Sequence, residues 1–432
     1  MTAPLRPLLL AEAANPEWVS VPLVGWSLAR ALSARTDAHL VTQVRNREAL
    51  LRAGLCEGRD FTAIDTEALA KVLWKVGTRL VGENKGYTLH SALSSFSYYL
   101  FEHLVWRTFG PRLMRREFDL VHRITPVSPS TPSILAGRCR RAGVPFVIGP
   151  INGGVPWPRE FAAFRRREQE WLSYLRGAYK LMPGYRATLR DAAAVLVGSR
   201  TTWAELPPWA RRFYLPENAI DPERFVARRT RRAERPLRAV FLGRLIALKG
   251  VDMLLEAAAP LVRAGALTVE LIGDGPERAA LEAQALREAL GEGVSFAGWV
   301  PHLEVPARLA AADVFVFPSI REFGGGAVLE AMAVGLASIV VDYAGPAELV
   351  TERTGWAIPL GPRPQLVARL RARLEALCAA PGELDRRGEA ALARAHRQFT
   401  WGAKADRVLE LYRFVLGQAE APDFPMPVPD LP

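Results

Sequence analysis

Two glutamates flank three consecutive glycines in the segment from Ile320 to Glu348, and these residue types together are suited to a phosphorylated ligand. Gly324, Gly325 and Gly326 have no side chains, so their backbone N–H groups can approach a ligand closely. The apolar run from Ala327 to Val334 predicts a helix that begins directly after them. A helix N-terminus preceded by glycines favours a diphosphate, so the segment predicts an anion-binding loop.

The two glutamates, Glu322 and Glu330, need a partner other than the phosphates, which a carboxylate would repel. Glu330 lies about one turn into the predicted helix, and its side chain is directed back toward the helix N-terminus. There it can accept hydrogen bonds from a pair of ribose hydroxyls. The segment therefore offers separate places for the phosphates and the ribose of a nucleotide.

Arg244 and Lys249 lie in the loop after a strand-like run. Arg244 directly follows Gly243, which is a further candidate for donor binding. Ligands of open α/β sheets bind outside the carboxyl ends of the strands, so both cations fall on the functional edge of the predicted sheet. An arginine fork and a mobile lysine charge together suit a diphosphate that becomes a leaving group. The alternative interpretation is that both are solvated loop residues.

Two further turns follow predicted strands of the same half of the chain. Gly273 and Gly275 precede a helix and either admit a nucleobase or phosphate or serve as plain turn residues. Val300 ends another strand and can offer backbone groups to a base edge. His302 beside it is more typical of the start of a helix than of a catalyst.

These residues must be positioned by sheets, and the apolar runs predict two of them. A chain of 432 residues is too long for one ordinary core. Continuous apolar runs alternate with helical stretches, as in parallel sheets buried on both faces. We therefore predict an α/β protein of two Rossmann-like, doubly wound domains. The predicted strands are residues 7–13, 38–44, 118–124, 145–151 and 193–199, then 237–244, 267–273, 294–300, 314–319, 338–342 and 356–360.

The domain boundaries follow from composition. Low apolar content, a basic run and prolines between residues 220 and 236 predict a linker. The predicted organisation is an acceptor-side domain (1–219), this linker (220–236), a nucleotide-sugar-binding domain (237–386), a helix that crosses back to the first domain (387–418) and a flexible proline-rich tail (419–432).

Several segments together resemble the retaining glycosyltransferases of family 4: GRLIALKG, LIGDGPER, VSFAGWV, PSIREFGGGAVLEAMAVGLASIVV and ENAID, within residues 212–360. The resemblance implies the GT-B fold, in which two Rossmann-like domains face each other across a cleft. It implies transfer of a hexosyl or related sugar from a nucleotide-sugar donor with retention at the anomeric carbon and without a protein nucleophile. It places Glu322 near the donor sugar, Glu330 on the ribose, and Arg244 and Lys249 on the diphosphate.

No Asp-X-Asp motif occurs in the sequence, and that motif is the usual metal anchor of the other large glycosyltransferase fold. We therefore expect no metal and no cofactor besides the donor substrate, with cationic side chains in place of the metal.

The first half departs from the family pattern at two points. The loop from Glu12 to Ser27 replaces a glycine-rich loop, and its first glycine is Gly25. His122 is present, but Ile124 stands where the family often has a second histidine, so we expect His122 to be a buried strand residue. Asn152, Gly153 and Gly154 follow the next strand and are candidates to line the cleft, facing either donor or acceptor.

The formal net charge of +11 favours anionic partners, although an arginine-rich composition can also reflect codon usage. Aromatic and basic residues mix in the stretches 94–116 and 171–186, which overlap the helical regions expected at 69–108 and 159–192. These stretches either settle on an anionic membrane or turn their aromatic stripes toward a core.

Three separate cysteines indicate buried thiols in a reducing compartment, because they form no metal-ligand or disulfide pattern. The N-terminal apolar run is too short for a signal peptide, and no apolar run is long enough to span a bilayer. We expect a cytoplasmic protein, peripheral at most to the inner face of the plasma membrane.

These features bear on three possible functions. The first is a glycosyltransferase that acts on a glycan or lipid-linked acceptor in cell-surface polysaccharide or glycolipid biosynthesis. The second is a catalytically silent GT-B protein that binds a nucleotide or a partner. The third, nucleic-acid binding, is disfavoured because the sequence has no recognised module and its basic runs are scattered.

Overall fold

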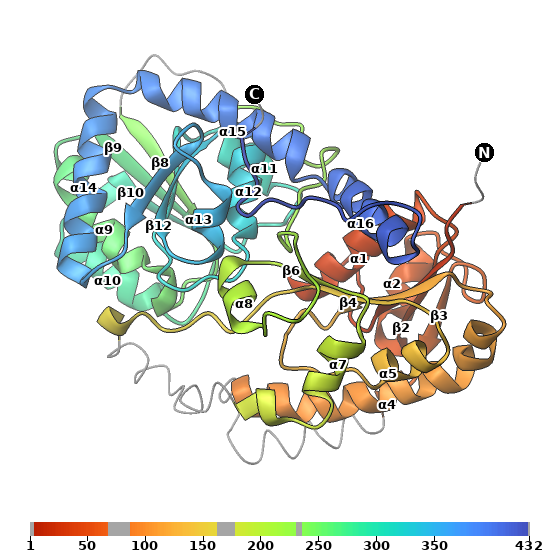
Figure 1. The fold of residues 1–432 in the computed structure, drawn as a ribbon. Coiled ribbons are helices and arrows are strands. Elements are labelled where there is room, and N and C mark those ends of the chain that lie inside the picture. Colours follow the sequence, from red (N-terminus) through yellow and green to blue (C-terminus); the bar gives the residue numbers. More distant parts are fainter. Residues whose placement is uncertain (1–3, 68–86, 162–177, 230–235, 431–432) are drawn as a thin grey trace. The chain divides into compact units, whose positions relative to one another are not determined.

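The computed structural model describes residues 4–67, 87–161, 178–229 and 236–430, and the chain divides into two compact units (Figure 1). The first unit comprises Met1–Gly154, Arg165–Glu217 and Trp401–Pro425. The second comprises Val155–Phe164, Asn218–Thr400 and Met426–Pro432. Each unit is built on one parallel sheet with helices on both faces, as the sequence predicted.

The sheet of the first unit has seven parallel strands in the order β3-β2-β1-β4-β5-β6-β7. The strand order reverses between β1 and β4, which is the point where open α/β sheets bind their ligands. The strands are β1 (Pro7–Ala11), β2 (His39–Gln43), β3 (Phe61–Ile64), β4 (Leu120–Thr125), β5 (Phe146–Ile151), β6 (Ala194–Val197) and β7 (Arg212–Tyr214).

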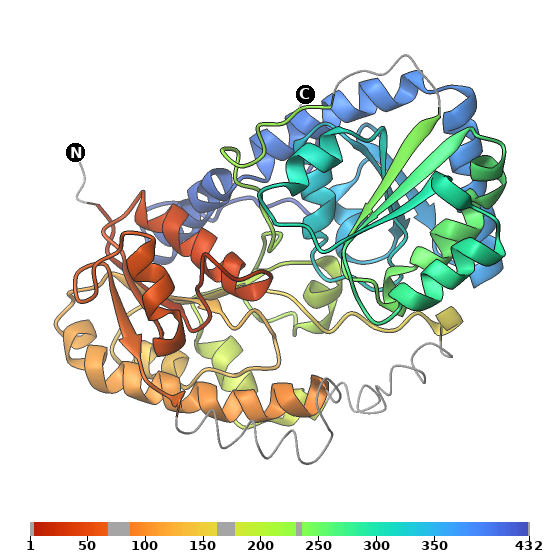
Figure 2. The ribbon, with the colours of Figure 1, turned by 180° about the vertical axis from the view of Figure 1, so that it is seen from behind.

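Helices lie on both faces of this sheet (Figure 2), and two clusters of buried apolar side chains fill the layers between the helices and the sheet. The aromatic residues Tyr98, Phe101 and Phe109 of the long helix α4 are buried in one layer, so the aromatic stripe of this helix faces the core. The opposite layer contains α1 and the C-terminal helix α16. The helices of the unit are α1 (Val21–Ser33), α2 (Arg47–Arg52), α4 (Tyr87–Met114), α5 (Ile134–Arg141), α7 (Tyr185–Asp191), α8 (Arg200–Glu205) and α16 (Trp401–Val415).

The sheet of the second unit has six parallel strands in the order β10-β9-β8-β11-β12-β13. These strands are β8 (Leu237–Leu242), β9 (Leu267–Ile272), β10 (Val294–Gly298), β11 (Val314–Phe317), β12 (Ala337–Asp342) and β13 (Gly355–Pro359). Helix α14 packs against α9, and α15 packs against α12. The helices are α9 (Val251–Arg263), α10 (Arg278–Arg287), α11 (Val305–Ala310), α12 (Gly326–Ala333), α13 (Gly345–Leu349), α14 (Arg363–Ala379) and α15 (Gly382–Gln398).

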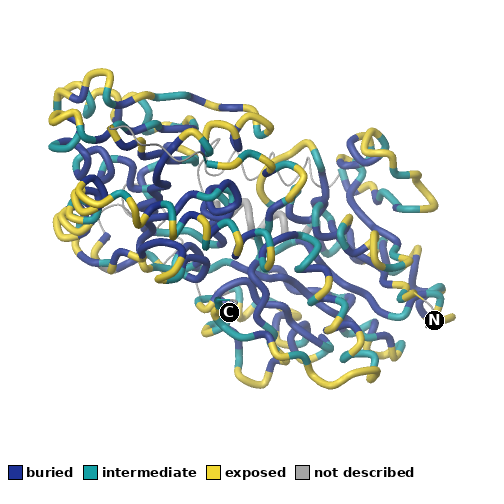
Figure 3. The backbone as a smooth tube through the Cα atoms, turned by 90° about the horizontal axis from the view of Figure 1, so that it is seen from above, coloured by how far each residue is buried: buried dark blue, intermediate teal, exposed yellow. Residues whose placement is uncertain are grey.

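All strands that the sequence predicted are present. They could be predicted because buried strands consist mainly of apolar residues. The inner strands β1, β4, β5, β6 and β11 are buried along their whole length (Figure 3). Only β3 and β7 were missed among the described strands. Both are short and lie at the two edges of the first sheet, where a continuous apolar run is not required.

The boundary between the units differs from the predicted linker. Ile220 and Phe225 are each only 1% exposed, and the Arg229 N–H donates to the carbonyl of Val334 at 2.8 Å. Residues 220–229 are therefore packed on the second unit, while residues 230–235 lie outside the described part. The predicted helix 387–418 is two helices, because the Phe399 carbonyl accepts from the Ile220 N–H at 2.8 Å and Thr400 forms a bridge with Ile220. Only the second of them, α16, clusters with the first unit.

The proline-rich tail also differs from the expected flexible segment. Phe424 is buried in the core of the first unit, and Val428 is buried in the second. The guanidinium of Arg394, itself only 4% exposed, donates to the Val428 carbonyl at 2.7 Å and to the Pro429 carbonyl at 3.0 Å. The tail is held because its backbone carbonyls satisfy a buried charge.

Of the three cysteines, Cys139 and Cys378 are buried as expected, whereas Cys56 is exposed in the turn before β3. Burial raises the pKa of the Cys139 thiol to about 12. Within the ranges that the structure describes, no helix is both long enough and apolar enough to cross a membrane.

A buried lysine on α16 makes stability depend on pH. Lys404 is 3% exposed and donates to the Pro216 carbonyl, and its burial lowers its pKa from 10.5 to about 7. Between about pH 7 and pH 10.5, Lys404 is neutral in the folded chain but protonated in the unfolded chain. Because the unfolded state binds more protons in this window, the free energy of unfolding rises with pH across it.

We predict that Lys404→Met flattens this dependence. The midpoint of urea unfolding should rise more from pH 7.5 to pH 9.5 in the wild type than in Lys404→Met, because the variant has no group to titrate there. The control is Lys180→Met, since Lys180 is exposed. An equal rise in the wild type and in Lys404→Met would show that the lysine ammonium is not desolvated.

Candidate functional site

The strand order of the second sheet reverses between β8 and β11, and the loops that follow these two strands carry the predicted site residues. Lys249 lies in a short 3-10 turn, Ala247–Lys249, after β8. Glu322 lies in the loop between β11 and α12. The polar residues therefore meet at the carboxyl edge of the sheet, at the topological switch point.

Lys249 and Glu322 form an ion pair at this point. The lysine Nζ contacts the glutamate Oε2, and the two side chains are only 14% and 18% exposed. The other carboxylate oxygen, Oε1, accepts from the Phe323 N–H at 3.2 Å, and the Lys249 Nζ lies 4.9 Å from the ring centroid of Phe317. A cation is thus held in place, partly shielded from water, where its interaction with an arriving anion is strengthened.

Helix α12 begins beside this pair, and its first turn is open. Gly325 precedes the helix with φ +67°, a left-handed conformation that favours glycine, and no side chain caps the helix. The first N–H groups of a helix have no acceptor within the helix itself. The start of α12 can therefore donate backbone hydrogen bonds to an anion.

Glu330 is the fifth residue of α12, as predicted, and two other side chains contact it. The His302 Nε2 lies 3.0 Å from the Glu330 Oε1, and the Arg224 Nη2 lies 3.4 Å from the same oxygen. Arg224 and His302 also contact each other. Arg224 belongs to the segment that was predicted to be a linker, and His302 precedes α11, so both were missed as site residues.

Glycine is required at positions 273 and 275, after β9, because the loop after β8 packs against the backbone there. A Cβ on Gly273, whose φ is +134°, would lie 2.0 Å from the Gly243 carbonyl oxygen, and one on Gly275 would lie 2.3 Å from the Leu245 carbonyl oxygen. The two loops are joined through the Leu245 N–H, which donates to the Asp274 carbonyl at 2.9 Å. The glycines let the loop that carries Arg244 approach the end of β9.

We predict that Gly273→Ala displaces this loop. The added methyl group should lower stability by about 1–3 kcal/mol through overpacking, and it should weaken nucleotide binding. Thermal unfolding and calorimetric titration with nucleoside diphosphates measure the two effects. Gly382→Ala is the matched control, because a Cβ there meets no atom within 4 Å. Unchanged stability in Gly273→Ala would contradict the described loop packing.

The remaining predicted donor residues are not all brought together. Arg244 is exposed, and within the described part of the chain its guanidinium has no hydrogen-bond or ion-pair partner. The Gly273 N–H donates to the Gly298 carbonyl at 2.8 Å, which joins the ends of β9 and β10, and Val300 beyond them is buried. Lys249 and Glu322 are therefore in direct contact, whereas Arg244 is not part of their ion pair.

In the first unit, His122 is fully buried, as expected of a strand histidine. Its Nε2 lies 2.7 Å from the Gly149 carbonyl and its Nδ1 lies 2.6 Å from the Tyr412 hydroxyl. Burial lowers the pKa of His122 to about 4, so the imidazole is neutral at physiological pH. Ile124, on the same strand, is buried in the apolar core.

Asn152 is buried at the end of β5. Its Oδ1 accepts from the hydroxyl groups of Ser199 at 2.7 Å and Thr202 at 3.1 Å, and from the Gly153 N–H at 2.9 Å. These bonds tie the end of β5 to the start of α8. Gly153 and Gly154 follow with positive φ and are partly exposed.

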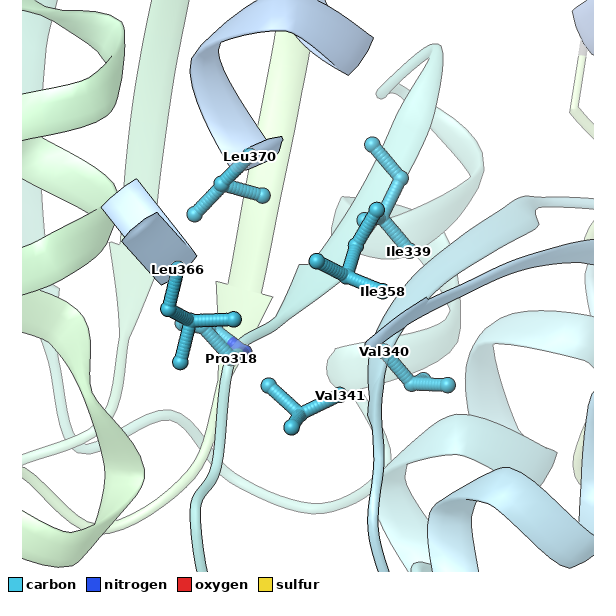
Figure 4. A pocket seen from close by; sticks show the side chains of 7 residues that line it. All are labelled: Pro318, Ile339, Val340, Val341, Ile358, Leu366 and Leu370. Carbon is cyan, nitrogen blue, oxygen red and sulfur yellow. The ribbon is translucent and has the colours of Figure 1, made fainter. Parts of the chain in front are cut away.

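A separate pocket in the second unit is apolar (Figure 4). Leu366 and Leu370 of α14 point toward Ile339 and Ile358 of the sheet. It has no charged group in its lining, so it is a region of core packing rather than a place for a nucleotide.

Residues 236–376 match the family model described as Glycosyl transferases group 1. The 2-deoxystreptamine glucosyltransferase of Streptomyces kanamyceticus is 40% identical over 96 residues, which are 22% of this chain and 25% of that protein. The protein WcaL of Salmonella typhimurium, named for colanic acid biosynthesis, is 33% identical over 263 residues, which are 55% of this chain and 64% of that protein. The chain thus spans less than two thirds of the length of these curated relatives.

The fold matches solved glycosyltransferase structures along nearly the whole chain. Sucrose-phosphate synthase from Thermosynechococcus elongatus has a TM-score of 0.62 at 18% identity, covering 96% of this chain and all of that one. The UDP complex of Anabaena Alr3699/HepE has a TM-score of 0.64 at 16% identity, covering 94% of this chain and 99% of that one. The two parallel, doubly wound sheets are those of the GT-B fold, as predicted.

Proposed function

We propose that the protein transfers a hexosyl or related sugar from a nucleotide-sugar donor to a glycan or lipid-linked acceptor, because residues 236–376 match the family model described as Glycosyl transferases group 1. The observation that carries the proposal is the Lys249–Glu322 ion pair at the switch point of the second sheet. An open helix N-terminus next to a fixed cation is suited to a diphosphate.

In the proposed reaction, the start of α12 and Lys249 hold the donor diphosphate, and Glu330 binds the ribose hydroxyls. As the bond from the anomeric carbon to the diphosphate oxygen breaks, Lys249 stabilises the charge that develops on the leaving oxygen. The acceptor hydroxyl forms the new bond on the same face of the sugar, and its proton passes to the leaving oxygen. Retention follows without a protein nucleophile, and the enzyme supplies positioning and electrostatic stabilisation.

Surface polysaccharide or glycolipid assembly is the biosynthetic context that we propose, supported by the similarity to WcaL. We assign donor binding to the second unit and acceptor binding to the first. Contacts to the diphosphate by cations and backbone N–H groups replace a metal ion in this proposal.

The test is the release of nucleoside diphosphate from a panel of donors that differ in base and sugar, with mixed glycan and polyprenyl-phosphate acceptors. We expect release from at least one donor, and much less release by Glu322→Gln and Lys249→Ala. The alternative is a catalytically silent nucleotide-binding protein, which the atypical loop 12–27 and Ile124 favour. Binding of nucleotide without release from any donor, by the wild type and both variants alike, would support that alternative.

Contact with an anionic membrane remains part of the proposal for lipid-linked acceptors. Tyr98, Phe101 and Phe109 of the stretch 94–116 are buried in the core. Met114 and Leu181, however, are 60% and 86% exposed, and Arg115 and Lys180 lie beside them. Residues 171–177 of the second aromatic stretch lie outside the described part. Co-sedimentation with vesicles that contain phosphatidylglycerol, compared with vesicles of phosphatidylcholine alone, tests this point, and equal binding to both would contradict it.

A further inference from the structure

The segment that follows the crossing into the second unit runs along helix α12. At the start of the helix, a Cβ on Gly326 would lie 3.5 Å from the Asn218 side chain. One turn further, Arg224 contacts Glu330. At the end of the helix, the Arg229 N–H donates to the Val334 carbonyl at 2.8 Å. Residues 218–229 therefore pack beside the helix that carries the proposed ribose ligand.

Arg224 and His302 reach Glu330 from two different segments and meet at one atom. His302 approaches from the loop between β10 and α11, and Arg224 from the segment beside α12. Both contact Oε1, at 3.0 Å and 3.4 Å, and the Glu330 side chain is only 19% exposed. Within the described chain, the second oxygen, Oε2, has no hydrogen-bond partner.

We propose that Arg224 and His302 are positioning residues that fix the Glu330 carboxylate so that Oε2 faces the two ribose hydroxyls of the donor. This inference rests on the proposed function and extends it to two residues outside the diphosphate site. A glutamate side chain has three rotatable bonds, and its conformational freedom weakens any hydrogen bond that it makes to a ligand. Contacts from two side chains on one oxygen reduce that freedom before the ligand arrives.

The environment of Arg224 supports a positioning role. The guanidinium carbon lies 4.8 Å from the ring centroid of Phe225, and the side chain is 18% exposed. Burial lowers the pKa of Arg224 from its ordinary value, and the nearby charges of Glu330 and Asp221 oppose that shift. A partly buried guanidinium that stacks on a ring and contacts a carboxylate has little freedom to move.

The ribose hydroxyls make the inference testable apart from any effect on folding. The probes are uridine, adenosine and guanosine diphosphates and their 2′,3′-dideoxy counterparts, titrated calorimetrically into the full-length protein. The variants are Arg224→Leu, Arg224→Lys, His302→Gln and Glu330→Gln. Glu223→Ala is the control, since Glu223 lies on the same segment and is exposed.

We expect Arg224→Leu and His302→Gln to weaken binding of the preferred ribonucleotide about tenfold, because they loosen a charge-assisted hydrogen bond. Binding of the dideoxy analogue should change less than about twofold, and Arg224→Lys should retain most of the preference for ribose. Glu330→Gln should lose the same preference.

Equal weakening toward ribo- and dideoxynucleotide by Arg224→Leu and His302→Gln would overturn the inference, since a merely structural role moves both. An undiminished preference for ribose in both variants would also overturn it. A wild type that binds none of the diphosphates contradicts the proposed function itself, and this inference falls with it.

Discussion

Lys249→Ala is expected to lower the rate of sugar transfer about 10²–10³-fold, the loss typical of removing one preorganised group that stabilises developing charge. The Nζ is held against Glu322 and above Phe317 and is mostly buried, so no water molecule reproduces its charge at the same place. The measurement is kcat for nucleoside diphosphate release with the best donor of the panel. Arg263→Ala, a change at an exposed residue of the same unit, is the control.

An alternative cause of such a loss is repulsion, because Lys249→Ala leaves Glu322 without its cation. The double variant Lys249→Ala with Glu322→Gln separates the two causes. If repulsion dominates, the double variant turns over no more slowly than Glu322→Gln alone, because both lack the repelling carboxylate. If Lys249 stabilises the leaving diphosphate, the double variant regains affinity but is still slower than Glu322→Gln alone. A loss of less than about threefold in the single variant would contradict the assigned role.

Glu322→Gln is expected to have opposite effects on binding and on turnover. Without ligand, the carboxylate neutralises Lys249, and a diphosphate must compete with it for the lysine. The neutral amide removes this competition and the repulsion, so the affinity for nucleoside diphosphate should rise about three- to tenfold, the range of one charged hydrogen bond in a partly exposed site.

Turnover of the same variant should fall about 10²-fold. The carboxylate is proposed to lie near the anomeric carbon, where a transition state with oxocarbenium character gains positive charge, and an amide cannot stabilise that charge equally. Calorimetric titration gives the affinity and single-turnover kinetics gives the rate. Glu282→Gln, at an exposed residue of α10, is the control. A parallel loss of affinity and rate would mean that Glu322 only supports the loop.

The sequence predicted the sheets well because both are buried on their two faces. The inner strands β1, β5, β6 and β11 are continuous apolar runs, and such runs can be recognised without a structure. The short strands at the edges of the first sheet escaped notice, since a strand there needs fewer apolar residues. The predictions for the linker and the tail differ from the structure for another reason. The Arg229 backbone N–H holds the linker segment to the Val334 carbonyl, and the Arg394 guanidinium holds the carbonyls of Val428 and Pro429 in the tail. Contacts to backbone groups leave no signal in the amino-acid composition.

The candidate site was only partly predictable. The spacing of Glu322 and Glu330 around three glycines is local, and it indicated both residues directly. Arg224 and His302 reach Glu330 from positions 106 and 28 residues away in the chain. A long-range contact of this kind has no local sequence pattern. The only indication in the sequence was that Arg224 and His302 are polar residues in segments close to the predicted functional edge of the sheet.

The roles of Gly273 and Gly275 show the limit of interpretation by residue type. The sequence left two interpretations open for them, room for a ligand or plain turn chemistry, and the adjoining loop of residues 243–245 fills the space where their Cβ atoms would lie. A glycine indicates that something approaches the backbone closely, and only coordinates show whether it is a ligand or the chain itself.

The central claim is that the switch point of the second sheet binds the donor diphosphate. A crystal structure of the protein with a bound nucleoside diphosphate tests it most directly. We predict that the terminal phosphate lies within hydrogen-bond distance of the Lys249 Nζ and of backbone N–H groups at the start of α12, with the ribose on Glu330. A nucleotide bound elsewhere in the second unit, or in the first unit, would contradict the claim.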